Sequence, residues 1–232
     1  MKTSNDDHNM DNVIDLFTGR KHSSEDDERI IRLAPELDGL EMLYSNESSD
    51  SKFFSLKVLC WALKANGEVM GLVPWLDDII TCPEIQDPLN GTFEGYYDPG
   101  IDEIFVEPPI HKVVELETAA EYYDYISDSP HESIQEIPDN IGTHAVLADK
   151  GFRSITLLEV ISWRLHGDGS ISGMLSDEKK VVSTPVLPGD VSLYQAQTDR
   201  QFRYFFQHNI ANKIKSEDPE ALEAISILVE ES

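Results

Sequence analysis

Residues 56–72, LKVLCWALKANGEVMGL, recur later in the chain as residues 158–174, LEVISWRLHGDGSISGM. The two stretches share the pattern L-x-V-x-x-W-x-L-x-x-[ND]-G-x-[VI]-x-G without a gap, and 163 − 61 and 169 − 67 both give an offset of 102. The match continues to a β-branched pair and a proline, which is Pro83 in the first copy and Pro185 in the second. Agreement at so many unusual positions indicates an internal duplication.

Each copy is expected to fold as an antiparallel meander. Apolar side chains alternate around Trp61, and a period of two with aromatic and branched residues is typical of a strand. The turn Asn66-Gly67, with its counterpart at 168–169, predicts a tight hairpin, because glycine adopts positive φ at no steric cost. Since the tryptophan recurs at the same position in both copies, core packing explains it better than ligand stacking.

The composition narrows the choice of partners. The chain has 232 residues, of which 44 are acidic and 18 are Lys or Arg, so its formal net charge is −26. Hydrophobic residues make up 40%, which is enough to bury a core and excludes disorder of the whole chain. Direct binding of nucleic acid or of anionic lipid needs clustered Lys and Arg. We therefore expect neither nucleic acid nor a membrane as a direct partner.

Several features favour a cytoplasmic protein. Residues 1–12 carry acids and lack the apolar segment of a secretory signal. No stretch approaches the roughly 20 apolar residues that span a bilayer. The two cysteines, Cys60 and Cys82, align with Ser162 and Thr184 of the second copy. Packed, reduced thiols are therefore expected, rather than a disulfide framework or a thiol chemistry shared by the repeats.

The duplication divides the chain into three regions. Residues 1–29 are predicted to be a disordered acidic arm, interrupted by an apolar island at 13–17 that is either a docking motif or a strap on the domain. Residues 30–130 are predicted to form the first unit and residues 131–232 the second. We expect the two units to pack as one compact body.

The predicted fold class is α+β, with two tandem related units and helices at the C-terminus. The apolar spacing near the end of the chain predicts an amphipathic helix over 199–215 with a basic polar face. The dipeptide Asp218-Pro219 predicts the start of a last helix. The apolar residues of the first of these helices recur at steps of 3, 4 and 8: Phe202, Phe205, Phe206, Ile210 and Ile214.

Residues 87–140 concentrate the negative charge. They hold 14 acidic residues and one base, Lys112, which gives 1 − 14 = −13, and they hold five of the eight tyrosines. Within this segment, 104–106 predicts a strand, 115–125 a short helix and 128–140 a loop. The candidate partner-binding residues surround the first tyrosine pair: Glu94, Tyr96, Tyr97, Asp98, Asp102, Glu103 and Glu107.

A contiguous acidic segment with tyrosines suits a basic partner, because complementary potentials guide association and set specificity. The sequence therefore favours a non-catalytic acidic interaction or regulatory protein that binds a basic protein, in one version as a nucleic-acid mimic. Self-association is a second version, in which the acidic segment meets the basic residues of 200–215. A face that is only solvated is the third.

Catalysis is the alternative function. Carboxylates of residues 94–121 could serve a hydrolase or a carbohydrate-active enzyme, with acids transferring protons and tyrosines stacking on a sugar. The sequence contains no nucleophile elbow, P-loop or dinucleotide-binding motif. His111 and Glu115 are four residues apart, but no second histidine completes a familiar metal-binding spacing. We therefore predict neither a metal nor a cofactor.

Overall fold

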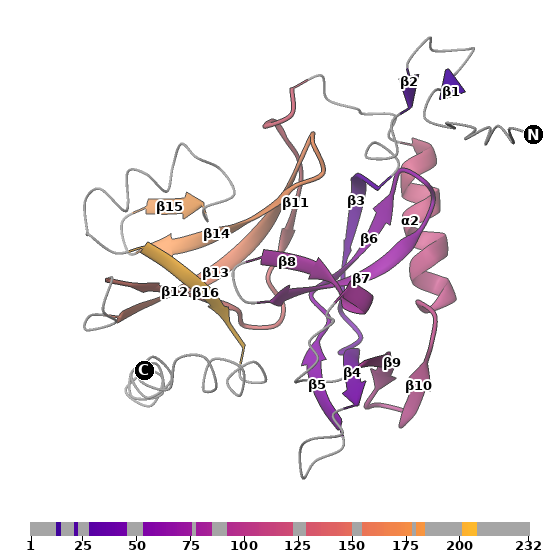
Figure 1. The fold of residues 1–232 in the computed structure, drawn as a ribbon, viewed down its shortest axis with the longest axis horizontal. Coiled ribbons are helices and arrows are strands. Elements are labelled where there is room, and N and C mark those ends of the chain that lie inside the picture. Colours follow the sequence, from indigo (N-terminus) through magenta and orange to yellow (C-terminus); the bar gives the residue numbers. More distant parts are fainter. Residues whose placement is uncertain are drawn as a thin grey trace, which may run out of the picture.

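The computed structural model describes residues 28–45, 53–75, 78–84, 92–122, 129–149, 155–177, 180–183 and 201–207, together with 13–14 and 21–22. These residues are mostly β, with three large sheets and one α-helix (Figure 1). The predicted α+β class with C-terminal helices is therefore wrong. Most of the predicted arm, 1–29, and the last helix predicted from residue 218 lie outside the described residues.

The first unit contains two antiparallel sheets. Sheet I has the order β3 (Ile30–Pro35), β6 (Cys60–Lys64), β7 (Val69–Trp75) and β8 (Asp78–Thr81). Sheet II has the order β10 (Glu103–Phe105), β9 (Thr92–Asp98), β4 (Glu41–Ser45) and β5 (Phe53–Lys57). A 3₁₀ turn, η1 (Cys82–Glu84), follows β8, and the helix α2 (Ile110–Tyr122) follows β10.

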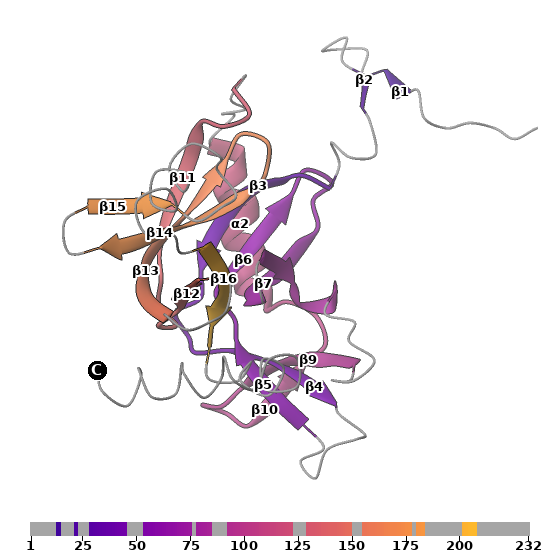
Figure 2. The ribbon, with the colours of Figure 1, turned by 60° about the vertical axis from the view of Figure 1, so that its left-hand side comes forward.

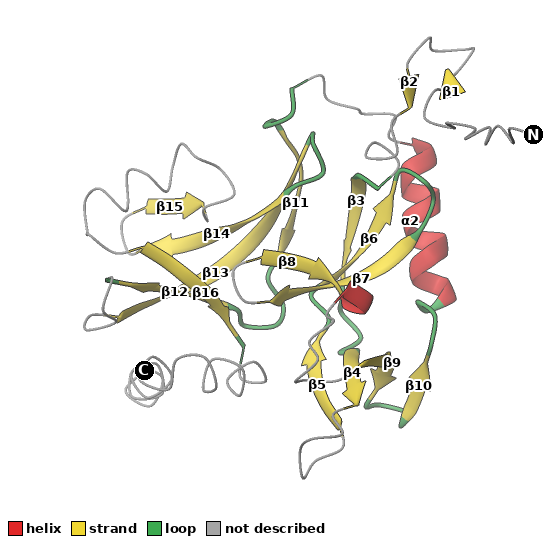
Figure 3. Cartoon of the chain, in the orientation of Figure 1, coloured by secondary structure: helices red, strands yellow, loops and turns green. Residues whose placement is uncertain are grey.

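The second unit is one larger sheet, sheet III (Figure 3). Its strands are β11 (Ser133–Pro138), β12 (His144–Ala148), β13 (Ile155–His166), β14 (Ile171–Asp177), β15 (Lys180–Ser183) and β16 (Gln201–Phe206). The order is β15-β14-β13-β12-β16, and β11 pairs with the C-terminal half of β13. Two short strands, β1 (Val13–Ile14) and β2 (Lys21–His22), pair with each other.

The two units pair their strands in the same way. The β3–β6 ladder shifts register between Ile30 and Arg32, and the β11–β13 ladder shifts at the corresponding place, between Ser133 and Gln135. A second pair of matching shifts divides the β4–β9 and β12–β16 ladders. The long strand β13 takes the places of β5 and β6, so β3 to β9 correspond to β11 to β16.

The helix predicted over 199–215 is wrong where the structure describes it, because Gln201–Phe206 is the strand β16. The register shift explains the misleading spacing. Phe202 pairs with Leu147 and Phe205 pairs with Ala145, with an extra residue in β16 between them. A β-bulge of this kind places two residues three apart on one side of the strand, and that is the spacing of a helix.

Two predictions between the copies also need correction. The predicted loop 128–140 contains the strand β11. The predicted helix 115–125 begins earlier, at Ile110, because the Pro109 carbonyl accepts the amides of Lys112 and Val113. Proline is compatible with a helix start, since the amide it lacks would have no partner there.

Sheet I is buried on both faces. The side of β6 that carries Trp61 and Leu63 packs in one apolar cluster with Leu116 of α2. The other side, with Cys60 and Ala62, packs in a second cluster with residues of sheet III, among them Ile137 and Trp163. Figures 1 and 2 show the resulting order of α2, sheet I and the strands β11 and β13. Sheet I thus covers the core of the second unit.

The corresponding face of sheet III is polar. Glu136 stands where β3 has Leu33, and Arg164 stands where β6 has Ala62. The two side chains form an ion pair of 2.8 Å and are 45% and 38% exposed. The two related faces therefore differ at these two positions, where sheet I has apolar residues and sheet III has a charged pair.

Candidate functional site

The hairpin of β9 and β10 carries most of the candidate residues, and its turn is defined by Asp98. The Asp98 carboxylate accepts the Gly100 amide at 2.8 Å, and its carbonyl accepts the Asp102 amide at 2.9 Å. Asp102 has a φ of 57°, which Asp tolerates better than most residues. The Asp98 carboxylate therefore stabilises the turn and also contributes to its negative charge.

The edge strand β10 depends on Gly95. This glycine has a φ of 143°, and a Cβ atom there would lie 2.6 Å from the Phe105 carbonyl oxygen. The ladders place Tyr204 at the corresponding position of β16. Among the described residues, only the first unit has a strand in the place of β10. The missing side chain at Gly95 lets β10 approach β9.

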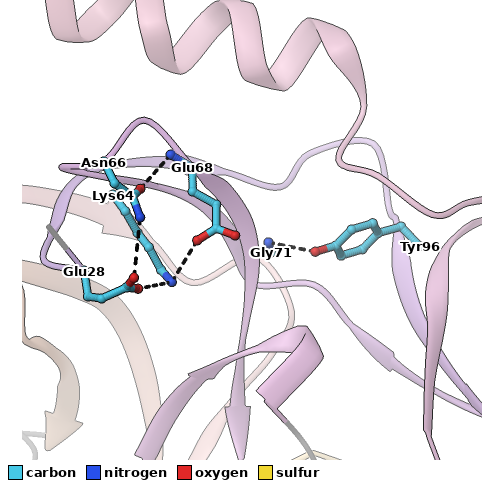
Figure 4. Close-up of polar contacts among 6 residues, drawn as sticks. All are labelled: Glu28, Lys64, Asn66, Glu68, Gly71 and Tyr96. Carbon is cyan, nitrogen blue, oxygen red and sulfur yellow. Dashed lines mark hydrogen bonds and ion pairs between the residues drawn. The ribbon is translucent and has the colours of Figure 1, made fainter. Parts of the chain in front are cut away.

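Tyr96 lies in the core and not on the hairpin surface. It is 2% exposed, its ring centroid is 4.7 Å from that of Trp61, and its hydroxyl accepts the Gly71 amide at 3.0 Å (Figure 4). A Cβ atom at Gly71 would lie 2.7 Å from the Tyr96 ring, so this glycine permits the close approach. Burial raises the pKa of the Tyr96 phenol above its usual range. This candidate residue is structural.

The other six candidates are accessible. Tyr97 and Asp98 are half-buried, and the remaining four, Glu94, Asp102, Glu103 and Glu107, are exposed. The Tyr97 hydroxyl donates to Asp102 Oδ1 at 2.9 Å. This hydrogen bond to a carboxylate raises the pKa of the Tyr97 phenol. The alternation along β9 thus separates two adjacent tyrosines, one inward and one outward.

The structure adds apolar residues that the sequence reasoning missed. Seven large apolar side chains are exposed among the described residues, and five of them lie between positions 101 and 114. They are Ile101 (58% exposed), Ile104 (53%), Val106 (73%), Ile110 (76%) and Val114 (52%). The sequence signal was the run Ile104-Phe105-Val106, in which all three residues are apolar although a strand at the edge of a sheet has only one side to bury. We call residues 94, 97, 98, 101–104, 106, 107 and 110 the acidic–apolar surface.

The base of this segment does not offset its acids. Lys112 is buried, and its ammonium lies 3.3 Å from the Asp38 carboxylate. His111 lies 3.2 Å from the same carboxylate. The hydrogen bond from His111, followed by the contacts of Lys112, outweighs burial and lowers the pKa of Asp38. Lys112 therefore anchors α2 to the β3–β4 connection and pairs with Asp38, not with the acids of the acidic–apolar surface.

A second polar cluster surrounds Lys64, whose side chain is 10% exposed (Figure 4). Its ammonium is 2.7 Å from Glu28 and 3.1 Å from Glu68. Burial disfavours the charged amine, but these two ion pairs outweigh it and raise the pKa of Lys64. Asn66 accepts the Glu68 amide at 2.8 Å and fixes the turn. Every polar group here has a structural partner, so the cluster holds the β6–β7 hairpin.

The corresponding residue of the second unit is His166, which is 1% exposed and contacts Ser172 Oγ at 2.8 Å. This pair does not form a nucleophilic site. Ser172 is fully buried, and no side chain among the described residues forms a hydrogen bond with Nδ1 of His166. The nearby Asp168 instead accepts from Ser170 and lies 3.8 Å from His131. A nucleophile needs access and a base oriented by a third group.

The thiols and possible metal ligands were the remaining candidates for chemistry. Cys60 and Cys82 are buried and free, and burial raises the pKa of both thiols. No group of three or more metal-ligating side chains occurs within the described ranges. Within those same ranges no helix is long and apolar enough to cross a membrane.

Comparison with known proteins adds no relative. No protein-family model, no curated protein and no solved structure matches the chain.

Proposed function

We propose that the chain is a non-catalytic interaction protein that binds a basic protein through the acidic–apolar surface. The observation that carries the proposal is the grouping of exposed apolar side chains with carboxylates along the β9–β10 hairpin and the start of α2. Large apolar side chains that are exposed together mark interaction sites, whereas isolated ones need no explanation. Five of the seven in the described residues fall within 101–114.

Charge supports a basic partner. Between residues 94 and 117 the sequence has seven acids and the single base Lys112, whose charge is paired with Asp38. The field of such a surface would speed the approach of a basic protein and repel acidic ones. The apolar side chains would then supply the burial that charge alone does not give, since exposed ion pairs contribute only about 0–1 kcal/mol.

The alternative, a hydrolase or carbohydrate-active enzyme using carboxylates of residues 94–121, has less support. Tyr96 is buried against Trp61, so it is not free to stack on a sugar. The Tyr97 hydroxyl is held by Asp102.

The test is retention of partners from cell lysate by three immobilised forms of the chain. These are the wild type, the double variant E103Q/E107Q and the control double variant E132Q/E159Q, whose glutamates are exposed on the second unit. The proposal expects a basic protein that the wild type and the control retain, and that E103Q/E107Q or high salt releases. Equal retention by both double variants would overturn it.

A further inference from the structure

The strand β10 is the outer strand of sheet II. Among the described residues it pairs with β9 alone, through Glu103, Ile104 and Phe105. An outer strand leaves every second amide and carbonyl without a partner in the sheet, and these groups can pair with a strand of another chain. Natural proteins usually protect such edges with charged side chains or cover them. Here the edge strand itself exposes Ile104 beside the charged Glu103, and the exposed Val106 follows it.

The side chains of β10 have different characters on the two sides of the sheet. Ile104 lies opposite Tyr97 on the outer side, whereas Phe105 lies opposite Tyr96, which is in the core. Glu103 lies on the side of Phe105, because successive side chains alternate. Val106 and Glu107 follow directly and are both exposed. A segment beside β10 would therefore meet Ile104 on one side of the sheet and the Glu103 carboxylate on the other, with Val106 and Glu107 exposed in the bend that follows.

We propose that β10 receives one extended segment of the basic partner as an added strand of sheet II. This inference rests on the proposed function and deepens it, because it states how the partner binds. The segment has apolar residues alternating with Lys or Arg, so that its apolar face covers Ile104 and Val106 and its basic face meets Glu103 and Glu107. Main-chain hydrogen bonds supply affinity and the alternating side chains supply specificity.

A second copy of this chain is a poorer occupant of the same edge. Pairing two β10 strands would bring Asp102, Glu103 and Glu107 of both copies together, and opposed like charges destabilise a strand pair. Among the described residues the second unit has no strand in the place of β10, and Tyr204 stands there where the first unit has Gly95. Each chain therefore offers one such edge within its described residues.

The probes are fluorescently labelled synthetic peptides. Each is added to the full-length wild-type protein. The first alternates Lys and Val over eight residues, and the second has the same composition with four Lys before four Val. Two further versions of the alternating peptide carry N-methyl groups on the Val amides or on the Lys amides. In a strand, alternate amides point to opposite edges, so each modification blocks one edge of the peptide. Binding is measured by fluorescence anisotropy, and protection of the amides of 103–105 by hydrogen exchange.

Strand addition predicts that one N-methylated peptide binds about tenfold or more weakly than the unmodified one, because it loses hydrogen bonds to β10, while the other keeps its affinity. It also predicts protection of the amides of β10 by the alternating peptide. V106D should weaken binding, and L37D, at an equally exposed apolar residue outside the surface, should not.

The other outcomes separate the two proposals. If the block peptide and both N-methylated peptides bind as tightly as the alternating one, strand addition is overturned and only an electrostatic surface remains. If no Lys-containing peptide binds, while the lysate experiment shows a partner lost in E103Q/E107Q, the partner binds through another mode. If both experiments fail, the proposed function fails with this inference.

Discussion

Trp61 donates its indole N–H to a carboxylate oxygen of Glu36 at 2.6 Å, inside the first unit. Trp163 makes the same contact with Asp139 at 3.0 Å in the second unit. Glu36 is 4% exposed and also accepts the Leu40 amide at 3.3 Å. In both units a carboxylate at the end of the first strand therefore ties the central tryptophan to the following turn.

Replacing Glu36 with Ala should lower the free energy of unfolding by about 2–4 kcal/mol, because it leaves the buried indole N–H and backbone amides without acceptors. The variant E36Q retains an acceptor oxygen and should lose less. Urea denaturation of both variants tests this. Equal losses for E36A and E36Q would contradict the role given to the acceptor.

The hairpin turns and the buried tryptophans of the duplicated units were predicted from the sequence. Gly67 and Gly169 have φ angles of 89° and 86°, as their hairpin turns require, and both tryptophans are fully buried. These features depend on short-range chemistry, namely positive φ in a turn and a period of two in a strand. Sequence reasoning is strongest for such features.

The strand with a β-bulge, β16, was not predicted from the sequence. A single inserted residue resets the alternation of β16, so Phe202 and Phe205 imitate a helix. Only part of the candidate site was predicted from the sequence, because the side of the sheet that a side chain faces depends on the surrounding fold. The acids of the hairpin were identified, but Tyr96 was placed on the surface because the sequence does not show which of two adjacent tyrosines faces the core. The exposed apolar residues were missed, since exposure depends on what packs around β10.

The face of sheet I that covers the second unit gives a second prediction. Ala62 is 1% exposed there, whereas its counterpart Arg164 is partly exposed. A62R should destabilise the chain by about 3–5 kcal/mol or prevent folding, because it buries an unpaired charge. R164A removes a surface ion pair and should cost about 0–1 kcal/mol. Similar stabilities of the two variants in urea would contradict the packing of the units.

His166 gives a prediction about pH. Burial lowers the pKa of this imidazole below its usual 6.5, although Asp168 partly opposes the shift. The unfolded chain therefore binds a proton at a higher pH than the folded chain, and stability falls as the pH drops from 6.5 toward the folded pKa. In H166Q this contribution should vanish. The difference in unfolding free energy between wild type and H166Q, measured from pH 7.5 to 5.5, should change with pH, and a constant difference would contradict the account.

Gly95 tests the support of the binding edge. G95A places a methyl group against the Phe105 carbonyl and should release β10, which hydrogen exchange would detect as faster exchange of the amides of 103–105. G142A is the matched control, because Gly142 also has a positive φ, of 72°, but has open space around it. It should cost about 1–2 kcal/mol of stability without a specific change at β10. Unchanged exchange of β10 in G95A would refute this role.

The most direct test of the acidic–apolar surface is photo-crosslinking in living cells. A benzoyl-phenylalanine residue is placed at position 106 or, as a control, at position 37, since both side chains are highly exposed in the structure. The account predicts a defined adduct with a basic protein from position 106, absent from position 37 and lost when E103Q/E107Q is added. Equal adducts from both positions, or none from position 106, would contradict the claim that this surface binds a partner.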